Sequence, residues 1–201
     1  MTKKILSVLL AVVIMLGSFL LPPIGGFSDL TPDASANTYG DFSYRFNTNG
    51  DNTVTVTGYL GDDEVVNIPS HINGYLVNTI DSGSSDWRNA VTINIPDTVK
   101  KISSYAFFAC SKLTTVHFGA GVCSIGDGAF SETQLSKFSV SSANKYLYTI
   151  DDVLFNKYNE LVAYPSGKTN THYTVPSGTT AILRRKAGDC SRVTAGPIDL
   201  I

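Results

Sequence analysis

Hydrophobic residues recur along this chain with a period of 23 residues, which is long enough to define a structural repeat. Six apolar positions between Ile93 and Phe107 are each matched by an apolar residue 23 positions later. The matched pairs are Ile93 and Val116, Ile95 and Phe118, Val99 and Val122, Ile102 and Ile125, Ala106 and Ala129, and Phe107 and Phe130. Six positions rarely stay in phase by chance, so the pattern predicts stacked coils around one hydrophobic interior.

Each repeat begins with a short stretch in which apolar and polar residues alternate. Val91–Pro96 and Thr114–Gly119 follow this period of two, which predicts a strand with one buried face. Proline or glycine then ends the strand, because proline lacks an amide hydrogen for the ladder and glycine weakens it. Adjacent coils should therefore align these short strands in a parallel sheet along one face of the solenoid.

The second half of each repeat has a longer apolar spacing, close to the period of a helix. In one repeat these positions are Val99, Ile102, Ala106, Cys110 and Leu113. We expect a short helical or 3-10 return on the other face, capped by Ser103 or Ser104. A single coil buries too little apolar surface to be stable alone, so Phe107 and Phe130 should be stacked neighbours. The predicted fold class is a repeat solenoid.

The pattern divides the chain into four parts. Residues 1–36 are predicted to be a signal peptide, 37–61 an N-terminal β-hairpin cap, 62–182 the repeat solenoid, and 183–201 a divergent C-terminal tail. The cap is predicted from alternating apolar residues on both sides of an Asn49-Gly50 turn. In the solenoid, Trp87 should fill the interior where Ser84-Ser85 replaces Ala-Phe, and a β-hairpin is expected to be inserted near 146–165.

The N-terminal residues have the organisation of an export signal. Lys3 and Lys4 precede an apolar run from Ile5 to Leu21, and Ala34-Ser35-Ala36 provides a cleavage site of small residues. An uncleaved membrane anchor is the alternative, because this site lies further from the apolar run than usual. A lipoprotein anchor is excluded, since no cysteine precedes Cys110. We therefore expect a secreted or cell-surface protein.

The rest of the chain has a nearly balanced charge and three cysteines. Without residues 1–36 it keeps 13 basic and 15 acidic side chains, a balance that gives no basis for nucleic-acid binding. Cys110 and Cys190 occupy equivalent slots two or more coils apart, roughly 10 Å or more, so we expect no disulfide between them. Cys123 is predicted to point outward as a free thiol, with a link between two chains as the alternative.

Several short motifs in the repeats resemble the BspA-like leucine-rich repeats of bacterial surface proteins. The matching motifs are Ile68-Pro69 and Ile95-Pro96, Val99-x-x-Ile102 and Val122-x-x-Ile125, Ala106-Phe107 and Ala129-Phe130, Cys110-x-x-Leu113, and Asp152-Val153-Leu154-Phe155. The resemblance spans about residues 40–182. It implies a right-handed leucine-rich-repeat solenoid, export to the cell surface, and a role in adhesion or protein binding. The family has no shared catalytic residues to carry over.

Reactive side chains do not combine into an active site or a metal site. Cys110 and His117 have the residue types of a thiol nucleophile and its base, but the repeat directs them to opposite sides of the sheet. His71 and His172 fall in other coils, so no histidine pair has the spacing of metal ligands. Asn47–Asn52 is rich in oxygen ligands but lacks the glutamate of an EF-hand loop. We expect no enzyme activity, no cofactor and no metal.

The candidate binding surface consists of residues that face outward from the predicted strands. One row is expected to contain Asn67, Asn94, His117, Ser139 and Thr174, flanked by Thr92, Thr115, Lys137 and His172. These short polar side chains can hydrogen-bond a partner without a large desolvation penalty. The expected partner is a host matrix protein, another surface protein, or a glycan. The alternative is a solvated row on a structural spacer, or on a truncated fragment of a larger surface protein.

The last predicted coil departs from the repeat. After Ile182 the chain reads Leu183-Arg184-Arg185-Lys186 where a turn is expected, although Cys190 and Val193 keep their slots. No polar capping repeat follows these residues. Our hypothesis is an altered or truncated terminus that leaves a sheet edge open.

Overall fold

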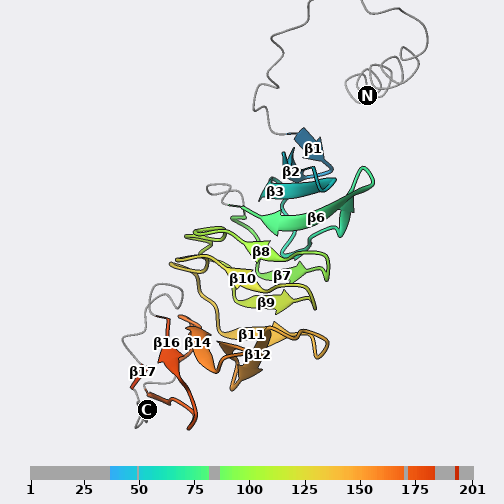
Figure 1. Ribbon diagram of the computed structural model, residues 1–201. Helices are drawn as coiled ribbons and strands as arrows, with labels where there is room; N and C mark the ends of the chain where they lie inside the picture. The colour runs from blue at the N-terminus through green and yellow to red at the C-terminus, as the bar shows by residue number, and fades with distance from the viewer. Residues whose placement is uncertain (1–36, 49, 82–86, 170–171, 184–192, 195–201) are drawn as a thin grey trace, which may run out of the picture. The chain divides into compact units, whose positions relative to one another are not determined.

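Strands from successive coils stack on one another in the order of the chain (Figure 1). The computed structural model describes residues 37–48, 50–81, 87–169, 172–183 and 193–194, which form a β-solenoid of about five coils. The expected signal segment and most of the expected C-terminal tail, including the proposed open edge, lie outside these residues. Over the described ranges, no helix is long and apolar enough to cross a membrane.

One parallel sheet contains the strands predicted from the alternating pattern. Its strands are β4 (Val65–Asn67), β7 (Thr92–Ile95), β9 (Thr115–Phe118) and β11 (Lys137–Val140), and they pair in that order. Ile93 of β7 lies opposite Val116 of β9, which is the predicted spacing of 23 residues. Both side chains are fully buried, so the outward neighbours on each strand are presented on the opposite face.

A second sheet runs along another side of the coils. Its strands are β1 (Asn37–Tyr39), β2 (Phe42–Phe46), β3 (Thr53–Tyr59), β5 (His71–Ile72), β6 (Tyr75–Ile80), β8 (Lys101–Ile102) and β10 (Ser124–Ile125). Strands β2 and β3 form an antiparallel hairpin at the predicted place, and β1 extends it by one strand. From β3 onward the pairing is parallel, through β6 and β8 to β10.

The helical or 3-10 returns expected after Val99 are not found in the described residues; turns and the two-residue strands β8 and β10 take their place. Tyr105 and Ala109 have φ angles of 60° and 58°, which a right-handed helix does not contain. Their amides donate to the next coil instead, to Asp127 O and Ser131 O, each at 3.0 Å. The backbone therefore satisfies its hydrogen bonds between coils, and the parallel strands occupy two faces rather than the single face expected.

A column of aromatic rings passes through the interior from coil to coil. Phe107 and Phe130 are stacked, with ring centroids 5.6 Å apart and an interplanar angle of 12°, as predicted. Trp87 lies 5.2 Å from Phe107 on the other side and is buried, so it fills the predicted interior position. Tyr59 continues the column at 6.0 Å from Trp87. These contacts fix how each coil is seated on its neighbour.

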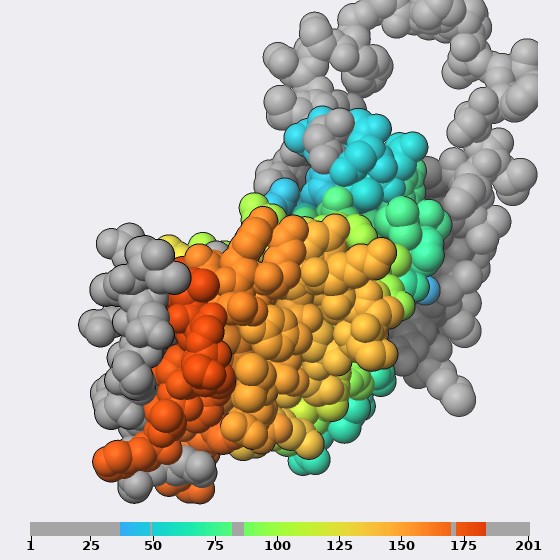
Figure 2. Space-filling view, turned by 60° about the horizontal axis from the view of Figure 1, so that its bottom comes forward, coloured from blue at the N-terminus to red at the C-terminus, as the bar shows by residue number. Residues whose placement is uncertain are grey.

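An antiparallel meander interrupts the stack after β11. It consists of β12 (Leu147–Ile150), β13 (Val153–Asn156) and β14 (Glu160–Ala163), and β14 then pairs in parallel with β16 (Ala181–Ile182). The insertion predicted near 146–165 corresponds to the β13–β14 hairpin with β12 added. Figure 2 shows the meander in orange beside residues 172–183 in red. A separate two-stranded sheet pairs β15 (Tyr173–Thr174) with β17 (Val193–Thr194).

Candidate binding surface

Four predicted polar residues face one another across the sheet of β4, β7, β9 and β11. Asn67 lies opposite Asn94, Asn94 opposite His117, and His117 opposite Ser139. Asn67 is exposed and the other three are half-buried. Asn94 Nδ2 donates a hydrogen bond of 2.7 Å to Asn67 Oδ1, so the first two side chains hold each other in place. We call Asn67, Asn94, His117 and Ser139 the sheet-face ladder.

A second row lies beside the sheet-face ladder and is less uniform. Thr92, Thr115 and Lys137 lie opposite one another, with Val65 at the β4 end of the row. Thr115 is only 8% exposed, so neighbouring side chains leave it little surface for a partner. Val65 is 54% exposed and adds an apolar group that the sequence-based selection omits.

The structure places His172 and Thr174 outside the sheet-face ladder. Thr174 belongs to β15, whose partner is β17, and His172 immediately precedes that strand. Both side chains are exposed. The meander lies between β11 and β15 in the chain, and β14 rather than β11 receives the next parallel strand. The period that aligns the first four residues therefore does not extend to these two.

Cys110 and His117 lie on opposite sides of their coil in accessibility. Cys110 is 4% exposed, with its Sγ 3.9 Å from the carbonyl oxygen of Phe108, whereas His117 is half-buried on the outer face of β9. Burial raises the pKa of the Cys110 thiol from 9.0 to about 12, so it stays protonated near neutral pH. A protonated, buried thiol is a poor nucleophile. Cys123 is an exposed free thiol, and Cys190 lies outside the described residues.

The oxygen-rich turn that follows β2 closes on itself. The Asp51 carboxylate accepts hydrogen bonds from the Thr53 amide at 3.2 Å and from the Thr53 hydroxyl at 2.5 Å. These bonds define a turn held by an aspartate side chain. Across the described residues, no three His, Cys, Asp or Glu side chains gather in a way that would hold a metal ion.

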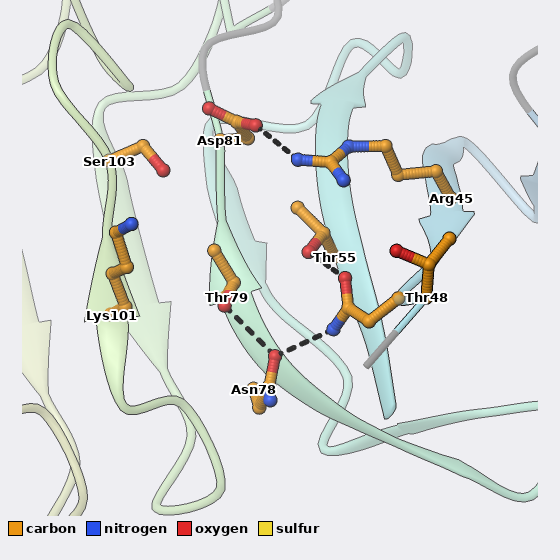
Figure 3. Close-up of a pocket in the computed structure, with 9 residues that line it drawn as sticks. Arg45, Thr48, Thr55, Asn78, Thr79, Asp81, Lys101 and Ser103 are labelled. Atoms are coloured by element: carbon orange, nitrogen blue, oxygen red, sulfur yellow. Dashed lines mark hydrogen bonds and ion pairs between the residues drawn. The ribbon is translucent and has the colours of Figure 1, made fainter. Parts of the chain in front are cut away.

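Sequence reasoning missed a polar hollow on the sheet that contains β2, β3, β6 and β8 (Figure 3). Its volume is about 330 Å³, and its lining consists of Arg45, Asn47, Thr48, Thr55, Asn78, Thr79, Asp81, Lys101 and Ser103. One outward row crosses these four strands, because Thr79 lies opposite both Thr55 and Lys101. The available signal was a polar residue before a buried isoleucine in Lys101-Ile102, which the helical interpretation leaves unused.

Comparison with protein families identifies the repeats. A model described as "BspA type Leucine rich repeat region" matches residues 78–175 with six copies. Residues 78–175 belong to the BspA-type leucine-rich repeat family. The resemblance inferred from the Ile-Pro, Val-x-x-Ile and Ala-Phe motifs is thereby confirmed, and the match indicates no catalytic family. No curated protein matches the chain.

Solved structures similar to this leucine-rich repeat protein come from several bacteria. A leucine rich cell surface protein from Faecalibacterium prausnitzii A2-165 has 18% identity and a TM-score of 0.36, covering 81% of this chain and 78% of that one. The pneumococcal vaccine antigen PcpA has 16% identity and a TM-score of 0.43, covering 74% of this chain and 60% of that one. A leucine-rich repeat protein from Bacteroides ovatus has 22% identity and a TM-score of 0.46, covering 79% and 40%.

Proposed function

We propose that this leucine-rich repeat protein is exported and binds another protein through the sheet-face ladder, as a surface adhesin or interaction module. The observation that carries the proposal is the alignment of four uncharged or weakly basic polar residues on one sheet face, from Asn67 to Ser139. Such groups hydrogen-bond a partner at a smaller desolvation cost than full charges. The Asn94–Asn67 hydrogen bond supports the proposal, because it lowers the entropy lost when a partner immobilises these side chains.

Export is supported by the sequence of the N-terminal segment. Two lysines precede the apolar run from Ile5 to Leu21, and a small-residue site follows at Ala34-Ser35-Ala36. Membership of a family of bacterial surface proteins points the same way. Among the partners considered, a matrix or surface protein suits the flat face of a four-stranded sheet better than a small glycan does.

The test is a binding screen of the exported chain against matrix and surface proteins, followed by titration of any partner found. The double variant Asn94→Lys with His117→Glu should weaken binding more than tenfold, because it places bulky charges in the centre of the contact. The two new charges are opposite in sign on facing residues, so they should not disturb the strand pairing. Ser124→Glu, an exposed residue of β10 on the other sheet, is the matched control.

A second reading is a spacer that holds another part of a longer surface protein away from the cell. Regular stacking through parallel strands would serve that role without any partner. Failure to find a partner in the screen would favour the spacer. Partner binding that the double variant leaves unchanged, with its thermal unfolding also unchanged, would remove the sheet-face ladder as the contact.

A further inference from the structure

The hollow beside β6 has an unusual lining for a site on a repeat protein, because none of its side chains is apolar. Six of the nine residues carry a neutral hydroxyl or amide, and the charged ones are Arg45, Asp81 and Lys101. These give the lining a formal charge of +1, whereas the whole chain carries −2. Figure 3 shows Lys101 and Ser103 at one side and Arg45 and Thr48 at the other, with the residues of β6 between them.

A break in the strand register builds the floor of this hollow. Val54 of β3 lies opposite Val77 of β6, but the next residue of β3, Thr55, lies opposite Thr79. Asn78 is therefore an extra residue in β6, and both Asn78 and Thr79 line the hollow. Register breaks of this kind re-aim side chains and are frequent beside functional sites.

Hydrogen bonds hold the uncharged groups of the hollow in fixed positions. Asn47 joins two strands, because its amide donates to Asn78 Oδ1 at 3.0 Å and its Oδ1 accepts from the Thr55 hydroxyl at 2.7 Å. The Thr79 hydroxyl donates to the same Asn78 oxygen at 2.9 Å. The side chains are thus oriented before any ligand arrives, which reduces the entropic cost of binding.

The two cations of the hollow differ in their surroundings. Arg45 Nη2 is paired with Asp81 Oδ2 at 2.6 Å. Lys101 is exposed and makes no ion pair or hydrogen bond with any residue that the structure describes. One ammonium group therefore stands ready for an anion beside fixed hydroxyl and amide groups.

We propose that this hollow binds an acidic sugar, with Lys101 pairing with the sugar carboxylate and the hydroxyl and amide side chains bonding its ring hydroxyls. An acidic peptide suits the site less well, because peptides are anchored by apolar or aromatic side chains and the lining offers those no contact. A volume of about 330 Å³ accepts one small polar unit rather than an extended chain. The site is separate from the sheet-face ladder and does not depend on the function proposed for it.

The proposal is tested by titrating the full chain with three probes: glucuronate, glucose, and a short polyglutamate peptide, using ligand-observed NMR. Glucose has the same ring without the carboxylate, and the peptide has carboxylates without the ring. Glucuronate should bind more tightly than either. Lys101→Gln should weaken glucuronate binding about tenfold, the usual loss for one charge-assisted bond, and leave any glucose binding unchanged. Lys100→Gln is the matched control, since Lys100 is exposed and adjacent but does not line the hollow.

Each outcome decides the proposal. Tighter binding of glucuronate that is lost in Lys101→Gln and kept in Lys100→Gln supports it. Equal loss in both variants would mean general attraction to surface charge, and would overturn it. Polyglutamate binding that depends on Lys101, with no glucuronate binding, would replace the sugar with an acidic peptide. Asn78→Ala provides a second variant, expected to weaken glucuronate and glucose alike because it removes the amide that orders the floor.

Discussion

Replacing Phe107 with alanine should destabilise the protein more than any single change on its surface. Phe107 is fully buried and lies between two rings, Trp87 at 5.2 Å and Phe130 at 5.6 Å. Truncation therefore opens a cavity inside the column and breaks contacts on both sides. Because each coil is stabilised only by its immediate neighbours, the loss falls on two coil interfaces at once.

The magnitude follows from burial and from the two ring contacts. Removing a buried phenylalanine ring costs about 3–5 kcal/mol. The interaction of Phe107 with Phe130 alone should contribute about 0.5–1.5 kcal/mol, measurable as the coupling energy of a double-mutant cycle. Phe108→Ala is the matched control, because the neighbouring ring is 41% exposed and packs on Tyr105 at the surface. It should cost well under half as much as Phe107→Ala.

The measurement is urea unfolding followed by tyrosine and tryptophan fluorescence and by circular dichroism. Phe107→Ala should lower the midpoint, and a reduced m-value or two separate transitions would show that the coils on either side have uncoupled. A loss below about 1 kcal/mol, or a loss equal to that of Phe108→Ala, would refute the argument that the aromatic column holds the coils together.

Three further outcomes follow from the structure. Iodoacetamide should label native Cys123 and spare Cys110, which peptide mass spectrometry checks, since burial keeps the Cys110 thiol protonated. As pH rises from 9 towards 12, the unfolding free energy should fall by up to about 1.4 kcal/mol per pH unit from this thiol, because only the unfolded chain ionises it there; Cys110→Ala should show a shallower decline in urea titrations. Gly121→Ala should lower the melting temperature by several degrees, because a Cβ there would lie 2.0 Å from Asp97 O of the previous coil, whereas Ala120→Gly should have a small effect.

The sequence was sufficient to predict the parts of the fold in which side-chain alternation and coil period act together. The contact of Phe107 with Phe130 follows from a constant offset of 23 residues, and Trp87 follows from a gap in the same pattern. Outward residues on β4, β7, β9 and β11 could be aligned for the same reason. In these cases each local signal specifies its own partner one coil away.

Two features could not be predicted because they depend on where backbone groups find partners. The apolar spacing after Val99 is compatible with a helix, and only the hydrogen bonds from Tyr105 and Ala109 to the next coil exclude one. Thr174 has the correct sequence pattern but lies on a different sheet, because the meander takes over the stacking position. Periodicity identifies equivalent residues, but it does not reveal which strand an insertion displaces.

The two candidate sites differ because one lies where the repeat is regular and the other where it fails. Between β7 and β9 the offset is constant, so equivalent side chains form the even sheet-face ladder, a surface suited to a broad partner. At Asn78 the antiparallel N-terminal hairpin joins the parallel stack, and the extra residue bends the local register. That irregularity creates a concave, hydrogen-bonded hollow, which a regular row of parallel strands would not provide. A solenoid of this kind can therefore place a protein-binding face and a small polar site on separate sheets, each open to change without disturbing the interior they share.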